Sequence, residues 1–436
     1  MKFFDYRFLP PPTFLVLVAL FLGPWMCQEA VAQKGKKNLC TVCQHDQKLL
    51  EKWGMNHGPF IFGPKQSTEI EEDLAWKGLW LETPHFRIGF SLKKWKIPNA
   101  ERKIYWPELL KLKEKFPKVK GKINTLDSWH RLHLFAERSE AIYEEFLSHV
   151  GRTQKEFDTL PPESVFYDAF GGDFQAVLQE YDLAHQRDTC LPRFLGVGRY
   201  LGQPMKFEVL LTQTESLLGE YKRSYLGITQ PRAQKWNNKV ETINVAGETV
   251  LRTRALWFGI SADAEKIKHD QHMHNALRHN IAMNLMDGYM LYLFEMPVWL
   301  SEGYAHYMRR LNTKDWNFYD AGEGSSGPQK DAKKWAPLVR KLVKQKKTPS
   351  FAKFIRLNDY VDLDFNGHLC AWSWVDFLFA QGDGQFGKFL TQLAVQPAGA
   401  GAAETQRDAF RDIFGWTIKA AEENWQTWVM KNYPTQ

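Results

Sequence analysis

Apolar side chains recur at helical spacing between Leu126 and Val150, which predicts a long amphipathic helix. Asp127 stands where a helix needs an N-cap, because its carboxylate can accept a hydrogen bond from the first turn. The apolar stripe consists of Trp129, Leu132, Phe135, Ile142, Phe146 and Val150. Upstream, residues 78–92 alternate between apolar and polar positions, as strands do. The N-terminal part is therefore expected to combine helices with strands.

A different order of elements is predicted from about residue 196. Residues 205–212 predict a buried strand, and a helix is expected from Glu215 to Gly227. A hairpin that turns at Gly247 and one more strand then lead into a long helix.

This long helix is expected to begin near residue 262 and to end at Gly288, a length of about seven turns. Its start is indicated by Ser261, Asp263 and Glu265. A second helix is expected from Pro297. Residues 321–328 predict a flexible loop, after which the chain is expected to be helical to its end.

The long helix carries a concentration of histidine. Four of the thirteen histidines fall within eleven residues, and the last of them, His279, lies one turn before Met283 on the same face. The following helix carries Glu302 in the segment WLSEGYAHY.

The segment from His279 to Met283 and the segment around Glu302 resemble the metal-binding region of the gluzincin metallopeptidases. This peptidase MA-like group includes thermolysin and the zinc aminopeptidases, and it carries HExxH on one helix and a glutamate on a following helix. Eighteen residues separate Met283 from Glu302, the gap found in the aminopeptidase branch. The resemblance covers about residues 196–436. It implies a small mixed sheet, active-site helices and a C-terminal helical lobe.

The resemblance places His279 and Glu302 at metal-ligand positions, Asn280 at the position of the general base and Met283 at that of the second histidine. A thioether suits Cu(I) rather than zinc, and an amide cannot accept the proton that zinc-bound water must release. We therefore expect a catalytically inactive pseudopeptidase without a cofactor, which binds a protein or peptide in the old substrate cleft or acts as a scaffold. The alternative is an active zinc-dependent peptidase or hydrolase with rearranged ligands.

Other histidines are weighed as replacement ligands by helix geometry. His274 points about 140° away from His279, and His272 lies about 10 Å along the helix from it. His306, one turn beyond Glu302, is the best rescue ligand. The simpler expectation for all three is a solvated or hydrogen-bonded histidine.

The fold class expected is α+β, with a helix-rich α+β region of unknown function at residues 33–195 and a gluzincin-like domain at residues 196–436. Residues 1–32 resemble a cleavable signal peptide, because Lys2 and Arg7 precede a short apolar run and Ala30-Val31-Ala32 offers a cleavage site. The mature protein is thus expected to be secreted or periplasmic and to have no transmembrane helix.

The mature chain would keep Cys40, Cys43, Cys190 and Cys370. For Cys40 and Cys43, a local disulfide or a small metal tether is favoured over redox catalysis, because no βαβ unit surrounds them. Cys370 lies in an apolar segment and is expected to be a buried core thiol.

The net charge of +7 includes a basic run at residues 330–356, with ten Lys or Arg residues and one acidic residue, Asp331. A solvated helix face is the expected role of this run. The alternative is a basic protein that binds an anionic envelope polymer. A nucleic-acid partner is not expected, since no known binding module is apparent.

Overall fold

The computed structural model describes residues 39–158, 198–203, 205–229, 234–236, 240–245, 248–253, 255–264, 267, 269–291, 296–314, 332–382, 384–394 and 402–435. Residues Cys40–Gln436 form one compact unit. The signal peptide expected at residues 1–32, the loop expected at residues 321–328 and Cys190 lie outside the described residues.

The described helices are α1 (Gln47–Lys52), α2 (Ser67–Asp73), α3 (Arg102–Lys115), α4 (Ser128–Val150), α5 (Gln154–Asp158), α8 (Glu215–Leu226), α9 (Asp270–Gly288), α10 (Val298–Asn312), α11 (Trp335–Lys344), α12 (Phe351–Phe354), α13 (Phe365–Phe379), α14 (Gln385–Ala394), α15 (Ala402–Phe414) and α16 (Ile418–Asn432). The described strands are β1 (Ile61–Phe62), β2 (Lys65–Gln66), β3 (Leu79–Glu82), β4 (Phe86–Phe90), β5 (Trp95–Lys96), β6 (Thr125–Leu126), β7 (Phe207–Thr212), β8 (Gln234–Trp236), β9 (Val240–Val245), β10 (Glu248–Thr253) and β11 (Trp257–Ser261). The fold class is α+β with a small mixed sheet and a helical C-terminal region, as the sequence predicted.

Five strands form a mixed sheet in the order β3-β4-β7-β11-β8. Strands β4, β7 and β11 run parallel to one another, while β3 and β8 pair antiparallel at the two edges. Strands β3 and β4 come from the region expected to be a separate N-terminal domain. The boundary expected at residue 195 therefore does not divide the folded chain into two units.

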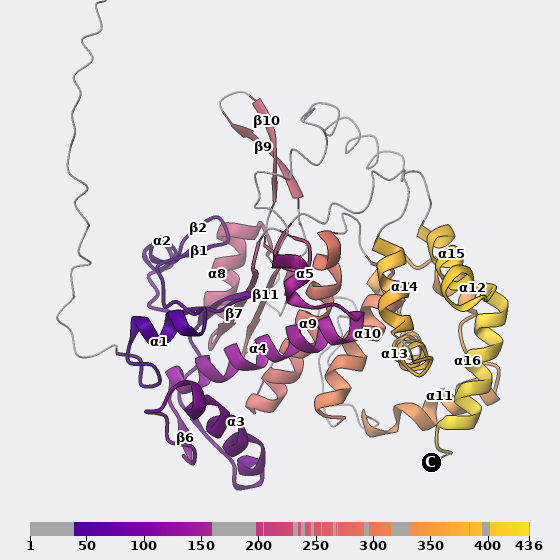
Figure 1. Ribbon diagram of the computed structural model, residues 1–436, viewed down its shortest axis with the longest axis horizontal. Coiled ribbons are helices and arrows are strands. Elements are labelled where there is room, and N and C mark those ends of the chain that lie inside the picture. Colours follow the sequence, from indigo (N-terminus) through magenta and orange to yellow (C-terminus); the bar gives the residue numbers. More distant parts are fainter. Residues whose placement is uncertain are drawn as a thin grey trace, which may run out of the picture. The chain divides into compact units, whose positions relative to one another are not determined.

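The two faces of the sheet pack against different helices because successive side chains of a strand point to opposite sides. Leu210 and Trp257 pack with Leu218 and Tyr221 of α8 on one face. Alternate residues of the same strands, including Val209, enter the main core, which also holds apolar residues of α4 and α9. Figure 1 shows α8 and α4 at the strands β7 and β11.

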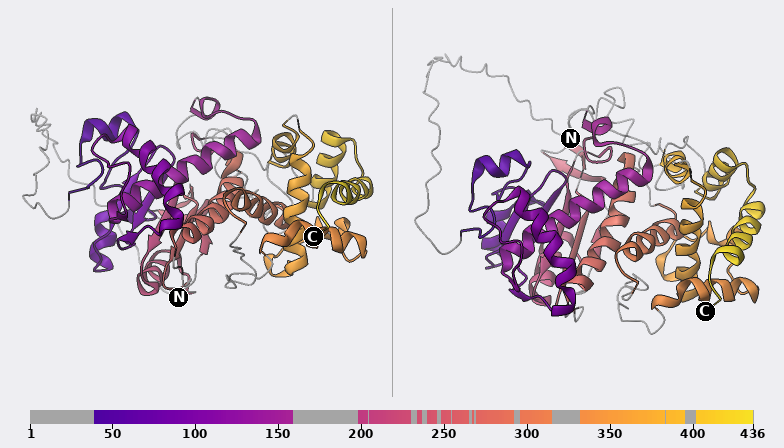
Figure 2. Two further views of the ribbon diagram at one scale, coloured as in Figure 1. Left: turned by 90° about the horizontal axis from the view of Figure 1, so that it is seen from below. Right: turned by 60° about the horizontal axis from the view of Figure 1, so that its bottom comes forward.

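Helices α4, α9, α10 and α13 are packed in succession, α4 against α9, α9 against α10 and α10 against α13. A buried ion pair joins the first two, since Arg131 of α4 donates through Nε to Asp270 Oδ2 at 3.1 Å and through Nη2 to the other carboxylate oxygen. The remaining C-terminal helices, coloured orange to yellow in Figures 1 and 2, include α11, α14 and α16, which contact α13. The sheet is thereby linked to the C-terminal helices through α9 and α10.

Helix boundaries follow the capping residues in most places. Asp127 caps α4 by accepting from the backbone N–H of His130, α8 ends at Gly227 in the left-handed conformation, and α10 begins after Pro297. Strands β9 and β10 pair antiparallel, with Val245 opposite Glu248, and Gly247, where the turn is expected, lies outside the described residues. The boundaries predicted at Asp127, Gly227 and Pro297 are confirmed.

The start expected for the long helix is wrong. The chain at Ser261 still belongs to β11, and the next residue, Ala262, donates its N–H to the carbonyl of Thr212. Helix α9 begins only at Asp270, while its end at Gly288 is as expected. Pairing with β7 thus keeps Ser261 in the sheet although its side chain suits a helix cap.

Core packing accounts for the aromatic residues of the C-terminal helices. Trp374 stacks on Phe351 and Trp425, and all three are buried. Cys370 is also buried, as expected for a core thiol. Among the described helices, none combines the length and apolar character that crossing a membrane requires.

Candidate metal centre

Three helices bring four side chains together at the centre of the helical part. His279 comes from α9, Glu302 and His306 come from successive turns of α10, and His368 comes from the first turn of α13. The exposed fractions are 0% for the first three and 1% for His368. Four polar residues are thus held in the core, where groups of this kind need partners or a metal ion.

The carboxylate of Glu302 is the common neighbour of the three imidazoles. Its Oε2 lies 3.3 Å from His306 Nε2, 3.5 Å from His368 Nδ1 and 3.7 Å from His279 Nε2. His306 Nε2 and His368 Nδ1 are 3.0 Å apart. The ligand atoms of His279, Glu302 and His306 all lie within 4.8 Å of one another.

These separations are those expected for atoms that share a metal ion. With Zn–N and Zn–O bonds of about 2.0–2.2 Å, the donor atoms of a tetrahedral site are roughly 3.3–3.5 Å apart. The triangle formed by Glu302 Oε2, His306 Nε2 and His368 Nδ1 has sides of 3.0, 3.3 and 3.5 Å. The group whose ligand atoms all lie within 4.8 Å of one another consists of His279, Glu302 and His306, so these three residues fit a divalent transition metal with two nitrogen ligands and one oxygen ligand. His368 lies beside this group, next to Glu302 and His306.

Burial and neighbouring charge set the protonation states of the cluster. Burial lowers the pKa of His279, and burial together with Arg309 lowers the pKa of His306 well below its usual range. Burial would raise the pKa of Glu302, but His279 and His368 outweigh it and hold that pKa well below its usual range. An ionised carboxylate and neutral imidazoles are the forms that bind metals.

Gly303 allows α10 and α13 to approach closely enough for His368 to reach Glu302. A Cβ at this position would lie 2.3 Å from the carbonyl oxygen of Ala371 and 2.9 Å from Val375 Cγ2. Both neighbours belong to α13, and the nearer one is a backbone atom that cannot turn aside. The glycine in WLSEGYAHY therefore has a packing role next to the glutamate.

Arg309 lies on the opposite side of His306 from Glu302. Its Nη2 is 3.3 Å from His306 Nδ1, and its guanidinium lies over the buried ring of Trp335. Metal coordination at Nε2 requires the ring proton on Nδ1, where Arg309 already presents an N–H. The arginine therefore competes with metal coordination by His306.

The two degenerate positions of the HExxH pattern are both buried in α9. Asn280 donates its Nδ2 to the backbone carbonyl of Ala276 at 2.9 Å, so its amide is engaged with its own helix. Met283 lies one turn after His279 and is fully buried. In place of a ligand at Met283, the structure brings His306 and His368 to Glu302.

The simpler expectation for the three histidines is a solvated or hydrogen-bonded side chain. It is confirmed for His306, whose Nε2 lies 3.0 Å from His368 Nδ1. Solvation is wrong for His274, which is buried. His274 is 7% exposed, and burial lowers its pKa far below the usual range, but it is not part of the cluster at Glu302. The rings of His272 and His269 pack in a T-shaped arrangement. His306 is the replacement ligand that helix geometry favoured, since it shares a face with Glu302.

His368 was missed by sequence reasoning. It lies 62 residues beyond His306, in a segment whose apolar pattern indicated only core packing. A signal was present in the sequence, because His368 is a polar residue near the start of a mostly apolar helix.

Comparison of the chain with known protein families, with curated proteins and with solved structures finds no match.

Proposed function

We propose that this protein is a metal-binding, gluzincin-like pseudopeptidase, in which His279, Glu302 and His306 hold a zinc ion or another divalent transition metal without performing hydrolysis. The observation that supports it is the approach of these three buried residues from two helices, with all their ligand atoms within 4.8 Å of one another. In this proposal the metal joins α9 and α10, His368 supports the ligands from α13, and the metal stabilises the surface that the protein offers to a protein or peptide.

The residue at the position of the family's general base argues against catalysis. This residue is Asn280, an amide whose nitrogen is hydrogen-bonded to the backbone of its own helix. An amide cannot accept the proton that a metal-bound water must release. A buried ion with no base at this position can stabilise structure without performing hydrolysis.

The proposal replaces the expectation of a protein without a cofactor. That expectation depended on Met283 at the second ligand position, because a thioether is a poor zinc ligand. With His306 beside Glu302, the third ligand comes from α10 instead. The sequence-based expectation of a noncatalytic protein is retained.

The test is the metal content of the full-length protein after dialysis, measured by elemental analysis for the wild type, His306→Ala and His272→Ala. We expect His306→Ala to lose one equivalent of metal per chain relative to the wild type, because it removes one of the three ligands. His272→Ala is the matched control, since it removes a histidine of α9 that is outside the cluster.

The same preparations separate a pseudopeptidase from an active enzyme when they are incubated with a mixture of unfolded proteins and peptides. We expect no cleavage by the wild type with its metal bound. Cleavage that disappears in His306→Ala would establish the active hydrolase with rearranged ligands. Equal metal content in the wild type and His306→Ala would refute the metal site itself.

A further inference from the structure

A second group of metal-ligating side chains lies in the N-terminal part, away from the cluster around Glu302. It consists of Cys40, Cys43, His57 and His133. The cysteines occupy a turn just before α1, His57 follows α1, and His133 lies in the second turn of α4. Cys40, Cys43 and His133 are at most 3% exposed, and His57 is partly buried.

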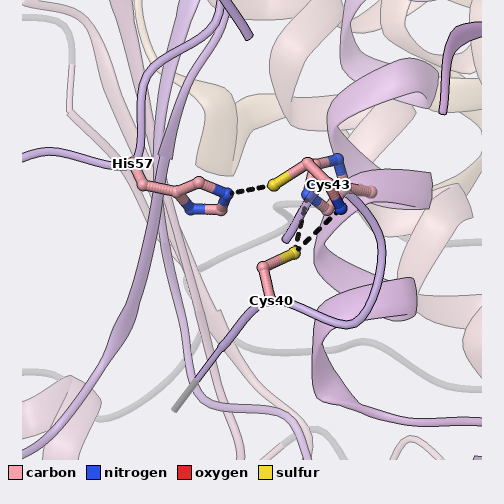
Figure 3. A group of neighbouring side chains, drawn as sticks. Cys40, Cys43 and His57 are labelled. Carbon is pink, nitrogen blue, oxygen red and sulfur yellow. Dashed lines mark hydrogen bonds between the residues drawn. The ribbon is translucent and has the colours of Figure 1, made fainter. Parts of the chain in front are cut away.

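The four donor atoms face one another. His57 Nε2 lies 2.9 Å from Cys43 Sγ, and His133 Nε2 lies 3.4 Å from Cys40 Sγ, as Figure 3 shows for the labelled pair Cys43 and His57. All four ligand atoms lie within 4.8 Å of one another. With Zn–S bonds of about 2.3 Å and Zn–N bonds of about 2.0 Å, sulfur and nitrogen donors of one tetrahedral ion are roughly 3.5 Å apart. The Cys40–His133 distance matches this value, and His57 needs to move back by about half an ångström.

Both cysteines are free thiols in this arrangement. The backbone N–H of Cys43 points at Cys40 Sγ, at 3.5 Å. An N–H directed at a sulfur stabilises the thiolate, the form of cysteine that binds metals. The turn therefore places two sulfurs on the same side and gives at least one of them a charge-stabilising partner.

His57 is oriented by a hydrogen bond behind it. Its Nδ1 lies 3.1 Å from the backbone carbonyl of Trp80 in β3, and a carbonyl can only accept. The ring proton is therefore on Nδ1, and the lone pair of Nε2 is directed at Cys43 and the other donors. This carbonyl–histidine arrangement is the usual support of an imidazole that binds a metal ion.

Aromatic rings surround the group on several sides. His45 stacks on His57 at a centroid separation of 4.6 Å, the edge of Trp129 meets His57 at 5.0 Å, and Phe116 meets His133 at 5.0 Å. The two cysteines are 0% and 3% exposed, so their sulfurs are shielded from water. A dry site strengthens the electrostatic attraction between thiolates and a cation.

We propose that Cys40, Cys43, His57 and His133 form a structural zinc site of the Cys2His2 type. Two thiolates and two neutral imidazoles at tetrahedral spacing are a ligand set that suits zinc, and four protein ligands leave no position for water. The site is independent of the metal centre at Glu302 and uses different elements. It joins the turn at Cys40, the segment after α1 and helix α4.

The position of the site gives it a structural role. Cys40 is the first residue of the compact unit, and α1 is a helix of six residues that contributes one fully buried side chain, Leu50. So short a segment has little apolar surface with which to hold itself to the fold. A metal that ties Cys40 and Cys43 to His133 of the long helix would fix the beginning of the chain where burial alone is weak.

The first experiment uses the wild-type full-length protein, purified with zinc and without chelators. An organomercurial that reacts with thiols displaces metal from thiolate ligands only, and the released zinc is followed with a zinc-sensitive dye. We expect one equivalent of zinc per chain to be released as Cys40 and Cys43 react. Replacement of zinc by cobalt(II) is expected to give thiolate-to-metal charge-transfer absorption in the near ultraviolet.

Variants then assign the site. Cys40→Ser is expected to lose one equivalent of zinc, while the equivalent removed by His306→Ala remains. Cys370→Ala is the matched control, because it removes a buried thiol of α13 outside the group and should leave the zinc content unchanged. If Cys40→Ser does not fold, the mercurial titration of the wild type still decides the question.

Two results would overturn the proposal. One is a peptide map of the unreduced protein in which a disulfide joins Cys40 to Cys43 and neither residue reacts with the mercurial before reduction. The other is zinc that the mercurial does not release from protein whose two thiols have reacted. A total of one zinc per chain, all released by the mercurial, would support this site and refute the metal centre at Glu302.

Discussion

Opposite charges flank the ring of His306. Glu302 Oε2 lies 3.3 Å from one ring nitrogen, and Arg309 Nη2 lies 3.3 Å from the other. The carboxylate favours a proton or a metal ion at Nε2, whereas the guanidinium disfavours positive charge on the ring. The balance between Glu302 and Arg309 at the ring of His306 therefore determines how tightly the cluster binds a cation.

Replacement of Arg309 by methionine tests this balance. Arg309→Met keeps most of the buried volume but removes the N–H at His306 Nδ1 and the positive charge near the metal. We expect zinc to bind about tenfold or more tightly, since groups that contact a ligand typically change metal affinity by roughly 10–100-fold. Competition against a chelator of known affinity measures the change.

Arg310→Met is the matched control for this prediction. Its guanidinium lies over the rings of Trp335 and Trp372, at 4.5 and 4.8 Å from their centroids. The control therefore also removes a cation from α10 and should leave zinc affinity within a few-fold of the wild type. Weaker zinc binding by folded Arg309→Met would mean that the arginine orients His306 for coordination.

Single residues show how far the sequence could predict the site. His306 follows from helical periodicity, because it lies one turn beyond Glu302, whereas the resemblance to the gluzincins supplied His279 and Glu302. His368 and His133 follow from neither, since they lie 62 and 93 residues from the side chains they approach. Local patterns carry no information on which distant segments meet, so both histidines needed the structure.

At the scale of elements, the contact between α10 and α13 determines whether the cluster can form. These two helices and α9 supply Glu302 and the three imidazoles around it. Gly303 is the point of closest approach, with the backbone of Ala371 where a side chain would be. The spacing of two helices thus depends on the absence of one methyl group.

Gly303→Ala is expected to destabilise the protein and to weaken metal binding. The added Cβ would meet a backbone oxygen at 2.3 Å, so α10 has to move away from α13. Overpacking of this kind costs about 1–3 kcal/mol, and the same shift separates Glu302 from His368. Urea unfolding and metal analysis of one preparation measure both effects.

Gly219→Ala in α8 is the matched control, because the nearest atom to its added Cβ is the side-chain nitrogen Arg223 Nη1 at 3.4 Å. Alanine in a helix with that much room is expected to raise the free energy of unfolding by about 0.4–1 kcal/mol. Unchanged stability and metal content in Gly303→Ala would show that the helices can separate without disturbing the ligands.

The elements also show which boundaries a sequence can predict. Caps such as Asp127, Gly227 and Pro297 act within one turn, so the ends they mark for α4, α8 and α10 are right. Ser261 has the same chemistry but belongs to β11, because its strand pairs with a segment about fifty residues earlier. A long-range hydrogen-bond ladder outweighed a local preference for helix.

At the scale of the whole molecule, one sheet contains strands from both of the regions that the sequence predicted to be separate, residues 33–195 and 196–436. Strand β4 pairs in parallel with β7, from Phe86 opposite Phe207 to Phe90 opposite Leu211. Helix α4 covers the same sheet and packs on α9. The change of pattern at about residue 196 therefore marks a change in the order of elements within one fold.

This arrangement predicts that residues 196–436 do not fold alone, whereas residues 40–436 do. Without β4 the fragment loses the buried side chains of Phe86, Ile88 and Phe90, each worth about 1.5–3 kcal/mol. Loss of α4 adds to this, and the total is comparable to the usual net stability of about 5–15 kcal/mol. Thermal unfolding followed by circular dichroism should show a cooperative transition for residues 40–436 only. Binding of a hydrophobic dye should reveal exposed apolar surface on the shorter fragment. A cooperative transition in residues 196–436, with metal bound at Glu302, would instead establish that segment as a domain of its own.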